Sequence, residues 1–163
     1  MIRVNFNVAP VAEQLAKAKA GLDDLTPVFQ DIGEALVKST RERFPAGTAP
    51  DGTRWRQKQP ATLAAYLRRG DGNRPYTLIG PSGRLGKEIA ALATARQVEI
   101  GSALEYSAVM QFGAAKGAFG TNKAGRPLPW GDIPARPFLG LSDQDERTIL
   151  DIVDEHLSDA LGG

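Results

Sequence analysis

Two long stretches of this chain repeat apolar residues at the three- and four-residue spacing of an amphipathic α-helix, and this pattern constrains the fold most. The first covers residues 26–44 and the second residues 142–161. Each has a single apolar stripe, so each helix must bury one face against another layer. The stripes consist of Phe29, Ile32, Leu36, Val37 and Thr40 in the first stretch, and of Ile149, Leu150, Val153, Leu157 and Leu161 in the second.

The residues at the ends of these stretches have well-known roles at helix termini. Thr26 and Pro27 are expected as the N-cap and the first residue of the first helix, and Pro45 is expected to end it. Ser142 is expected as the N-cap of the second helix, and Asp145 completes a variant of the capping box. Local sequence therefore predicts where both helices begin and where the first one ends.

Strand patterns are shorter and lie between or before the helices. Apolar and polar residues alternate over residues 2–8, which predicts a half-buried strand. Residues 88–95 and 97–102 are predicted to form a hairpin, although a helix over 84–95 remains an alternative to its first strand. Shorter helices are predicted at residues 11–20, 61–69 and 106–115. The expected fold class is α+β, with a small, mostly antiparallel sheet packed against the two longer amphipathic helices.

A length of 163 residues suits a single domain, which is expected to cover residues 1–163. Within it, residues 113–131 contain five glycines and two prolines without any periodicity. This Gly-rich segment is predicted to be a flexible loop. A loop of this length is long for a passive connection, so it is either mobile or ordered by a partner.

The residues that enzymes and metal sites need are scarce. The chain has no cysteine and one histidine, which excludes a disulfide framework, a thiolate zinc site and a cysteine nucleophile. Ser82 is not in a nucleophile elbow, and the glycines around it lack the spacing of a phosphate loop. We therefore expect no catalytic residue, no cofactor and no metal. The chain shows no signal peptide and no apolar run of membrane-spanning length, so we expect synthesis in the cytoplasm and no membrane partner.

The net charge of +1 is the remainder of two opposed regions. Residues 41–96 hold eleven basic and four acidic residues, a balance of +7, and residues 142–163 hold one basic and seven acidic residues, a balance of −6. The basic region surrounds Trp55 and Tyr66. Three interpretations remain open: contact with nucleic acid phosphates, contact with the acidic helix of another copy, and scattered solvated charges.

Three groups of residues follow one another as they do in one protein family. They are Phe44, Pro50-Asp51-Gly52, Trp55 and Thr62; then Leu78-Ile79, Ser82-Gly83-Arg84-Leu85 and Ile89; then Ile100-Gly101, Tyr106-Ser107-Ala108, Gln111-Phe112-Gly113 and residues 133–142. Over residues 25–157 the chain resembles the phage virion morphogenesis family, the tail-completion proteins of Mu-like and P2-like tailed phages. The most specific part is Ile-Pro-Ala-Arg-Pro-Phe-Leu-Gly at residues 133–140, downstream of Gln-Phe-Gly.

The resemblance implies a non-enzymatic structural protein of the virion. It would complete the head-proximal end of a phage tail and enable head–tail joining, in the tail or neck of the particle. It implies an α+β subunit that works as a homo-oligomeric ring, expected to be a hexamer. The implied partners are the tail tube or terminator protein and the head-connector protein. Contact with DNA that passes through the neck is a further possible partner interaction, which belongs to the alternative function given below.

Ten residues are candidates for an assembly interface, drawn from the two charged regions and from the family motifs. They are Arg54, Trp55, Arg56, Arg84, Gln111, Phe112, Arg136, Phe138, Asp151 and Glu155. Arg136 has two possible roles: it binds the next subunit, or its segment only orders the final helix while Phe138 anchors in the core. The alternative function is a DNA-binding module that uses the basic region at residues 41–96.

Overall fold

The computed structural model describes residues 2–4 and 24–161. Its elements are β1 (Ile2–Val4), α2 (Thr26–Ala46), α3 (Pro60–Arg68), α4 (Arg84–Lys87), β2 (Ile89–Ala93), β3 (Val98–Ser102), α5 (Ser107–Phe112) and α6 (Asp143–Leu161). The helices predicted at 26–44, 61–69, 106–115 and 142–161 are therefore confirmed, with small changes at their ends. The predicted helix at 11–20 and most of the first predicted strand lie outside the described residues.

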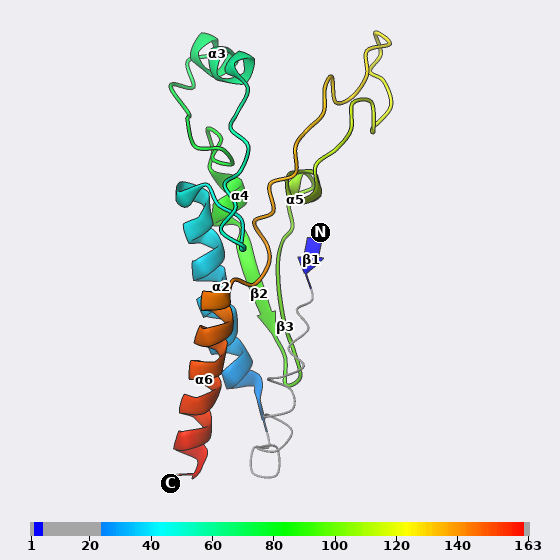
Figure 1. Cartoon of the computed structure of the whole chain (residues 1–163). Coiled ribbons are helices and arrows are strands. Elements are labelled where there is room, and N and C mark those ends of the chain that lie inside the picture. The colour runs from blue at the N-terminus through cyan, green and yellow to red at the C-terminus, as the bar shows by residue number, and fades with distance from the viewer. Residues whose placement is uncertain (1, 5–23, 162–163) are drawn as a thin grey trace.

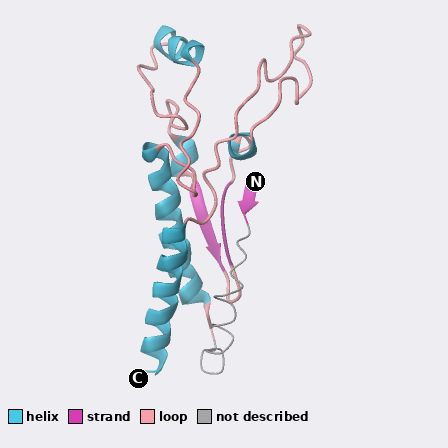
Figure 2. Ribbon diagram, viewed as in Figure 1, coloured by secondary structure: helices cyan, strands magenta, loops and turns pink. Residues whose placement is uncertain are grey.

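The body of the molecule is elongated, and two arms leave it at one end (Figure 1). Helices α2 and α6 run side by side along the body, next to the strands. We call residues 47–83, which include α3, the α3 arm, and residues 113–133, which follow α5, the hairpin arm. Both arms consist largely of loops (Figure 2). The C-terminal end of α6 lies at the end of the body opposite to the arms.

The described strands form one antiparallel sheet in the order β1-β3-β2. A tight turn joins β2 to β3, because the Thr94 N–H donates to the Gln97 carbonyl at 2.8 Å. The small antiparallel sheet and the hairpin are thus confirmed, and so is the α+β fold class. The alternative helix over 84–95 is limited to the single turn of α4.

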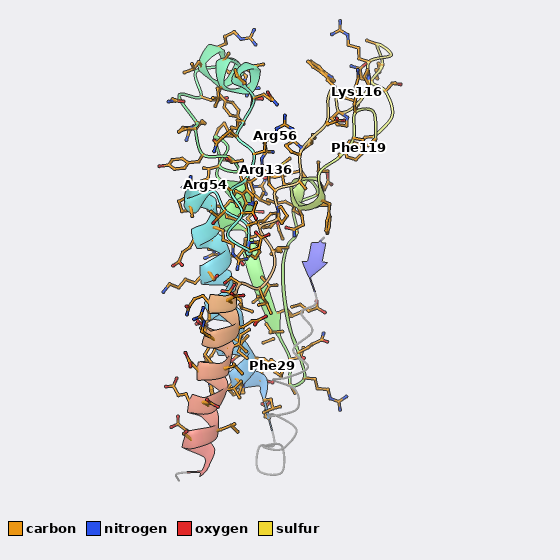
Figure 3. All side chains as sticks on the ribbon, viewed as in Figure 1. Phe29, Arg54, Arg56, Lys116, Phe119 and Arg136 are labelled. Atoms are coloured by element: carbon orange, nitrogen blue, oxygen red, sulfur yellow. The ribbon has the colours of Figure 1, made fainter. Side chains whose placement is uncertain are left out.

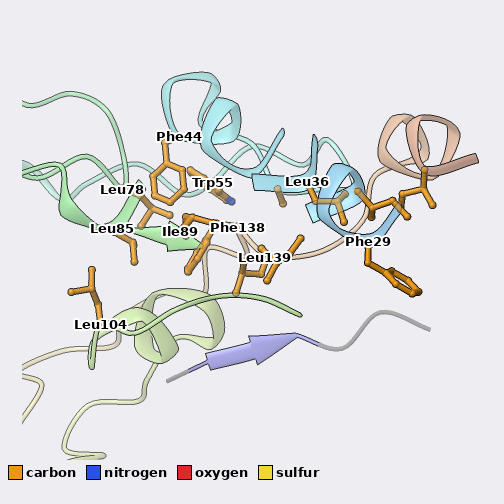
Figure 4. Close-up of a cluster of buried hydrophobic side chains, with 14 of the residues drawn as sticks. Phe29, Leu36, Phe44, Trp55, Leu78, Leu85, Ile89, Leu104, Phe138 and Leu139 are labelled. Atoms are coloured by element: carbon orange, nitrogen blue, oxygen red, sulfur yellow. The ribbon is translucent and has the colours of Figure 1, made fainter. Parts of the chain in front are cut away.

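Helix α2 covers the hairpin closely because Gly33 has no side chain. A Cβ atom at Gly33 would lie 2.9 Å from the Cβ of Ala91 and 3.1 Å from a methyl group of Val98. The predicted stripe of α2 faces this layer, with Phe29, Ile32, Leu36 and Thr40 buried. The core continues to the roots of the arms, where Phe44, Trp55, Leu78, Leu85 and Phe138 lie together (Figure 4).

Three predicted details of the long helices were wrong. Pro45 does not end α2, because it removes only one hydrogen bond near the helix terminus. The helix ends at Ala46, and Gly47 at the C-cap position, with a φ of 70°, turns the chain away. The residue at the N-cap position of α2 is Leu25 rather than Thr26. In α6, Leu150 is 37% exposed, and Ile152 is half-buried. The predicted capping box is confirmed, since Ser142 and Asp145 exchange hydrogen bonds of 2.8 Å and 3.1 Å.

Candidate assembly interface

The two most specific sequence motifs meet at one buried side chain, Gln111 of α5. Its Oε1 accepts hydrogen bonds from the backbone N–H groups of Phe138 at 2.9 Å and Leu139 at 3.0 Å, and its Nε2 donates to the Leu139 carbonyl at 3.0 Å. The backbone N–H of Arg136 also donates to the Met110 carbonyl, at 2.8 Å. The Gln-Phe-Gly run and the segment at 133–140 are therefore two halves of one clamp.

Gly113 fixes the root of the hairpin arm directly after this clamp. Its φ is 74°, and a Cβ there would lie 2.6 Å from the Ile133 carbonyl oxygen and 2.7 Å from the Ala135 nitrogen. Ala114 and Ile133 exchange backbone hydrogen bonds of 2.9 Å and 2.7 Å across the arm. Only glycine combines this backbone conformation with so close an approach. The third residue of the Gln-Phe-Gly run thus sets the direction of the arm.

Arg136 joins the roots of the two arms. Its side chain is buried, and its Nε donates to the Arg56 carbonyl at 2.9 Å. Burial lowers the pKa of Arg136, and the nearby charge of Arg56 lowers that pKa further. Trp55 makes a parallel link, because its indole N–H donates to the Pro137 carbonyl at 2.9 Å. Arg56 and Arg136 lie at the level where the arms separate (Figure 3).

A second buried arginine ties the two long helices to the same segment. Arg43 of α2 donates to the carbonyls of Phe138 and Gly140, both at 2.9 Å, and forms an ion pair with Asp145 of α6. Burial lowers the pKa of Arg43, and the carboxylate of Asp145 acts against this shift. Residues from the basic and acidic regions thus meet inside one chain. Sequence analysis did not find this contact, because no local pattern links positions so far apart.

The ten candidate interface residues divide into two sets by burial. The structure brings four of them together at the roots of the arms, where they hold the chain's own fold: Trp55, Gln111, Arg136 and Phe138. Six side chains are exposed and do not form one cluster: Arg54, Arg56, Arg84, Phe112, Asp151 and Glu155. Arg84 at the start of α4 forms an ion pair with Glu88, the residue that follows this helix, with 2.6 Å between Nε and Oε1. An interface role for these residues stays a prediction.

The hairpin arm carries exposed residues that sequence analysis missed. Phe119 is 57% exposed and Trp130 is 70% exposed, and Lys116, Lys123 and Arg126 lie on the same arm. Figure 3 shows Lys116 and Phe119 on this arm, well away from the body. The available signal was two large aromatic residues inside a glycine-rich segment without periodicity, since exposed apolar residues on loops mark interaction sites.

Residues 6–158 match the model of the phage virion morphogenesis family. The chain belongs to this family. It is also 29% identical over 158 residues to a protein of Escherichia phage Mu called "Putative capsid assembly protein G", an alignment that covers 93% of this chain and 95% of the Mu protein. No solved structure matches. The protein's role therefore lies in the construction of a phage particle.

Two kinds of feature are absent from the parts of the chain that the structure describes. No helix there is long and apolar enough to cross a membrane. No group of three or more histidine, aspartate or glutamate side chains within those residues is placed to hold a metal ion.

Proposed function

We propose that this protein is a non-enzymatic virion component that completes the head-proximal end of a phage tail and enables head–tail joining. The family match over residues 6–158 carries the proposal, because it spans the segments that build the clamp and both arms. The expected neighbours are a tail tube or terminator protein on one side and a head-connector protein on the other. The subunit works in a homo-oligomeric ring, expected to contain six copies.

The free edge of β2 supports self-association. In an antiparallel pair, residues alternate between those whose backbone N–H and C=O groups bond to the partner strand and those whose groups point away from it. Because Thr94 bonds to Gln97, the backbone groups of Ile89, Ala91 and Ala93 point away from β3. The Ile89 carbonyl accepts a hydrogen bond from Arg41 at 3.0 Å. Among the described residues, no side chain makes a corresponding hydrogen bond to the outward backbone groups of Ala91 or Ala93. An uncovered edge is a template for pairing with another chain.

The sheet offers two different edges for contact between copies. Among the described residues β1 pairs with β3 alone, so β1 and β2 form two different edges of one sheet. Contact between different edges is heterologous, and heterologous contacts form a closed ring where the rotation between copies closes and an open filament where it does not. A groove of about 1080 Å³ lies between α2 and β2, with Val37, Pro45 and Leu92 in its lining. This groove has room for the side chains of a strand added by the next copy.

Proline at Ala93 tests the edge. Its backbone N–H points outward, so Ala93→Pro keeps the β2–β3 pairing and blocks an added strand. We expect a folded protein, by thermal unfolding, that no longer forms oligomers in sedimentation velocity and is missing from purified particles. Leu92→Pro is the matched control, and it should unfold at a lower temperature because its N–H serves β3. If Ala93→Pro forms the same oligomers as the wild-type protein and is incorporated into particles, the proposal that the β2 edge mediates assembly is contradicted.

Inactivation of the gene in the phage that carries it tests tail completion. We expect DNA-filled heads and separate tails to accumulate, as seen by electron microscopy. Addition of the purified protein should then restore joined, infectious particles. Failure to form heads would instead favour a role in capsid assembly, as named for the Mu protein. Normal joined particles, or the absence of the protein from purified virions, would reject the proposal.

A further inference from the structure

Basic residues from two segments that are distant in the sequence come together at the arm-bearing end of the molecule. The α3 arm has a net charge of +4 and the hairpin arm a net charge of +2. Only the first lies within the basic region at 41–96, and the structure adds Lys116, Lys123 and Arg126 at the same end. We propose that this end of the protein binds the phosphate backbone of nucleic acid.

The carboxylates of the arms already accept hydrogen bonds from groups within the arms. The carboxylate of Asp51 accepts the Thr53 N–H at 2.9 Å, and that of Asp132 accepts the Lys116 backbone N–H at 2.8 Å. The third carboxylate, that of Asp71, accepts a hydrogen bond from Arg69 at 3.1 Å. Six exposed cations on the arms, which the structure describes completely, have no acidic partner: Arg54, Arg56, Arg68, Lys116, Lys123 and Arg126. Their charge is therefore available to a polyanion.

Two basic side chains at the roots of the arms serve the fold instead. Lys58 donates to the carbonyls of Arg74 at 2.9 Å and Ile79 at 2.8 Å, and burial lowers the pKa of Lys58. Arg136 is held in the same way by the Arg56 carbonyl. The structure thus separates buried bases, which connect the arms, from exposed bases, which extend outward. Only the exposed set has the mobility and hydration of phosphate-contacting side chains.

Helix α6 carries the opposite charge. The exposed carboxylates of Asp151, Asp154 and Glu155 lie from the middle of α6 toward its C-terminal end, which is far from the arms. Such a charge distribution repels phosphates at one end and attracts them at the other, so it orients the subunit with its arms toward nucleic acid. Exposed Phe119 and Trp130 beside the cations also offer stacking surfaces for unpaired bases.

This inference deepens the proposed function and rests on it for its biological setting, because DNA that passes from head to tail is the polyanion that a neck component meets. Binding itself is a property of the purified chain. Fluorescence anisotropy with a duplex of about 30 base pairs, and with a single strand of thymidines of equal length, measures it without particles. We expect micromolar affinity that falls at least about tenfold between roughly 50 and 200 mM salt.

The triple variant Lys116→Glu, Lys123→Glu and Arg126→Glu should lose at least about tenfold in affinity at low salt. The matched control reverses the same amount of charge at three exposed positions of the body: Lys38→Glu, Arg96→Glu and Arg147→Glu. It should keep its affinity within about threefold. Thermal unfolding of both variants confirms that they are folded. A variant with alanine at Phe119 and Trp130 tests stacking. If its affinity falls for the single strand but not for the duplex, stacking on unpaired bases contributes to binding.

Two results of the binding measurements alone would overturn the inference. One is no binding of either probe at about 50 mM salt. The other is an equal loss in the arm and body variants, which would mean that net charge alone governs binding. An arm variant that binds both probes normally but prevents head–tail joining would assign the arms to a protein partner and would likewise overturn it. A failure to bind DNA would not contradict the proposed role in tail completion, because that role is tested separately by the assembly of particles.

Discussion

Arg43 of α2 and Asp145 of α6 form a buried ion pair, with side chains only 7% and 5% exposed. Asp145 also accepts hydrogen bonds from the backbone N–H and hydroxyl of Ser142, at 2.8 Å and 2.7 Å. One carboxylate thus caps α6 and holds α2 beside it. The basic and acidic regions, for which contact between separate copies was one of three open interpretations, each supply one member of this pair within a single chain.

Replacement of Arg43 with methionine should destabilise the protein by about 3–5 kcal/mol, because it leaves the Asp145 carboxylate buried without its cation. Urea unfolding measures the free energy of unfolding. Arg84→Met is the matched control, since it removes an exposed ion pair with Glu88 and should change the unfolding midpoint little. Equal effects of the two substitutions would mean that the Arg43 pair contributes no more than a surface contact.

Gln111→Leu should destabilise the protein by about 2–4 kcal/mol, because two backbone N–H groups and one carbonyl then lose their buried partner. Gln144→Leu on the exposed side of α6 is the control and should cost less than about 0.5 kcal/mol. Hydrogen exchange of the Phe138 and Leu139 amides offers a local measurement. Unchanged protection of these two amides in Gln111→Leu would refute the clamp.

Local patterns predicted the elements of this fold better than the contacts between them. The stripe of α2 and the Ser142–Asp145 cap could be found in the sequence, because both depend on residues within a few positions of each other. Leu150 was assigned wrongly to the buried face of α6. It flanks the stripe on one side and Ile152 flanks it on the other, and the position of α2 decides which flank is covered.

The candidate site shows the same limit more strongly. The Gln-Phe-Gly run and the segment at 133–140 were both singled out in the sequence, but nothing there indicated that Gln111 binds the backbone at Phe138. Such a contact depends on how the chain returns after the hairpin arm. Trp55 and Arg136 were likewise candidates for an interface between subunits, with a role within the fold left open for Arg136, and the structure gives both side chains partners within the chain.

Gly113→Ala should destabilise the protein by at least about 2 kcal/mol more than Gly120→Ala, because its Cβ would collide with backbone atoms. Both glycines lie on the hairpin arm with positive φ, 74° and 81°, and Gly113 also has a ψ of 179°, in a region of backbone conformation that is essentially limited to glycine. Gly120 has open space around it, which makes it the matched control. Equal melting temperatures for the two variants would show that the root of the arm relaxes freely.

Arg136→Ala separates the two roles considered for this residue. Because the guanidinium of Arg136 donates to the Arg56 carbonyl from a buried position, its loss should destabilise the protein by about 1–3 kcal/mol. Hydrogen exchange should also speed up across residues 54–58, where the α3 arm leaves the body. Arg56→Ala is the control, since its exposed side chain leaves the same backbone carbonyl in place and should leave the melting temperature unchanged. If Arg136→Ala instead melts like the wild type but no longer enters oligomers or particles, Arg136 acts between subunits.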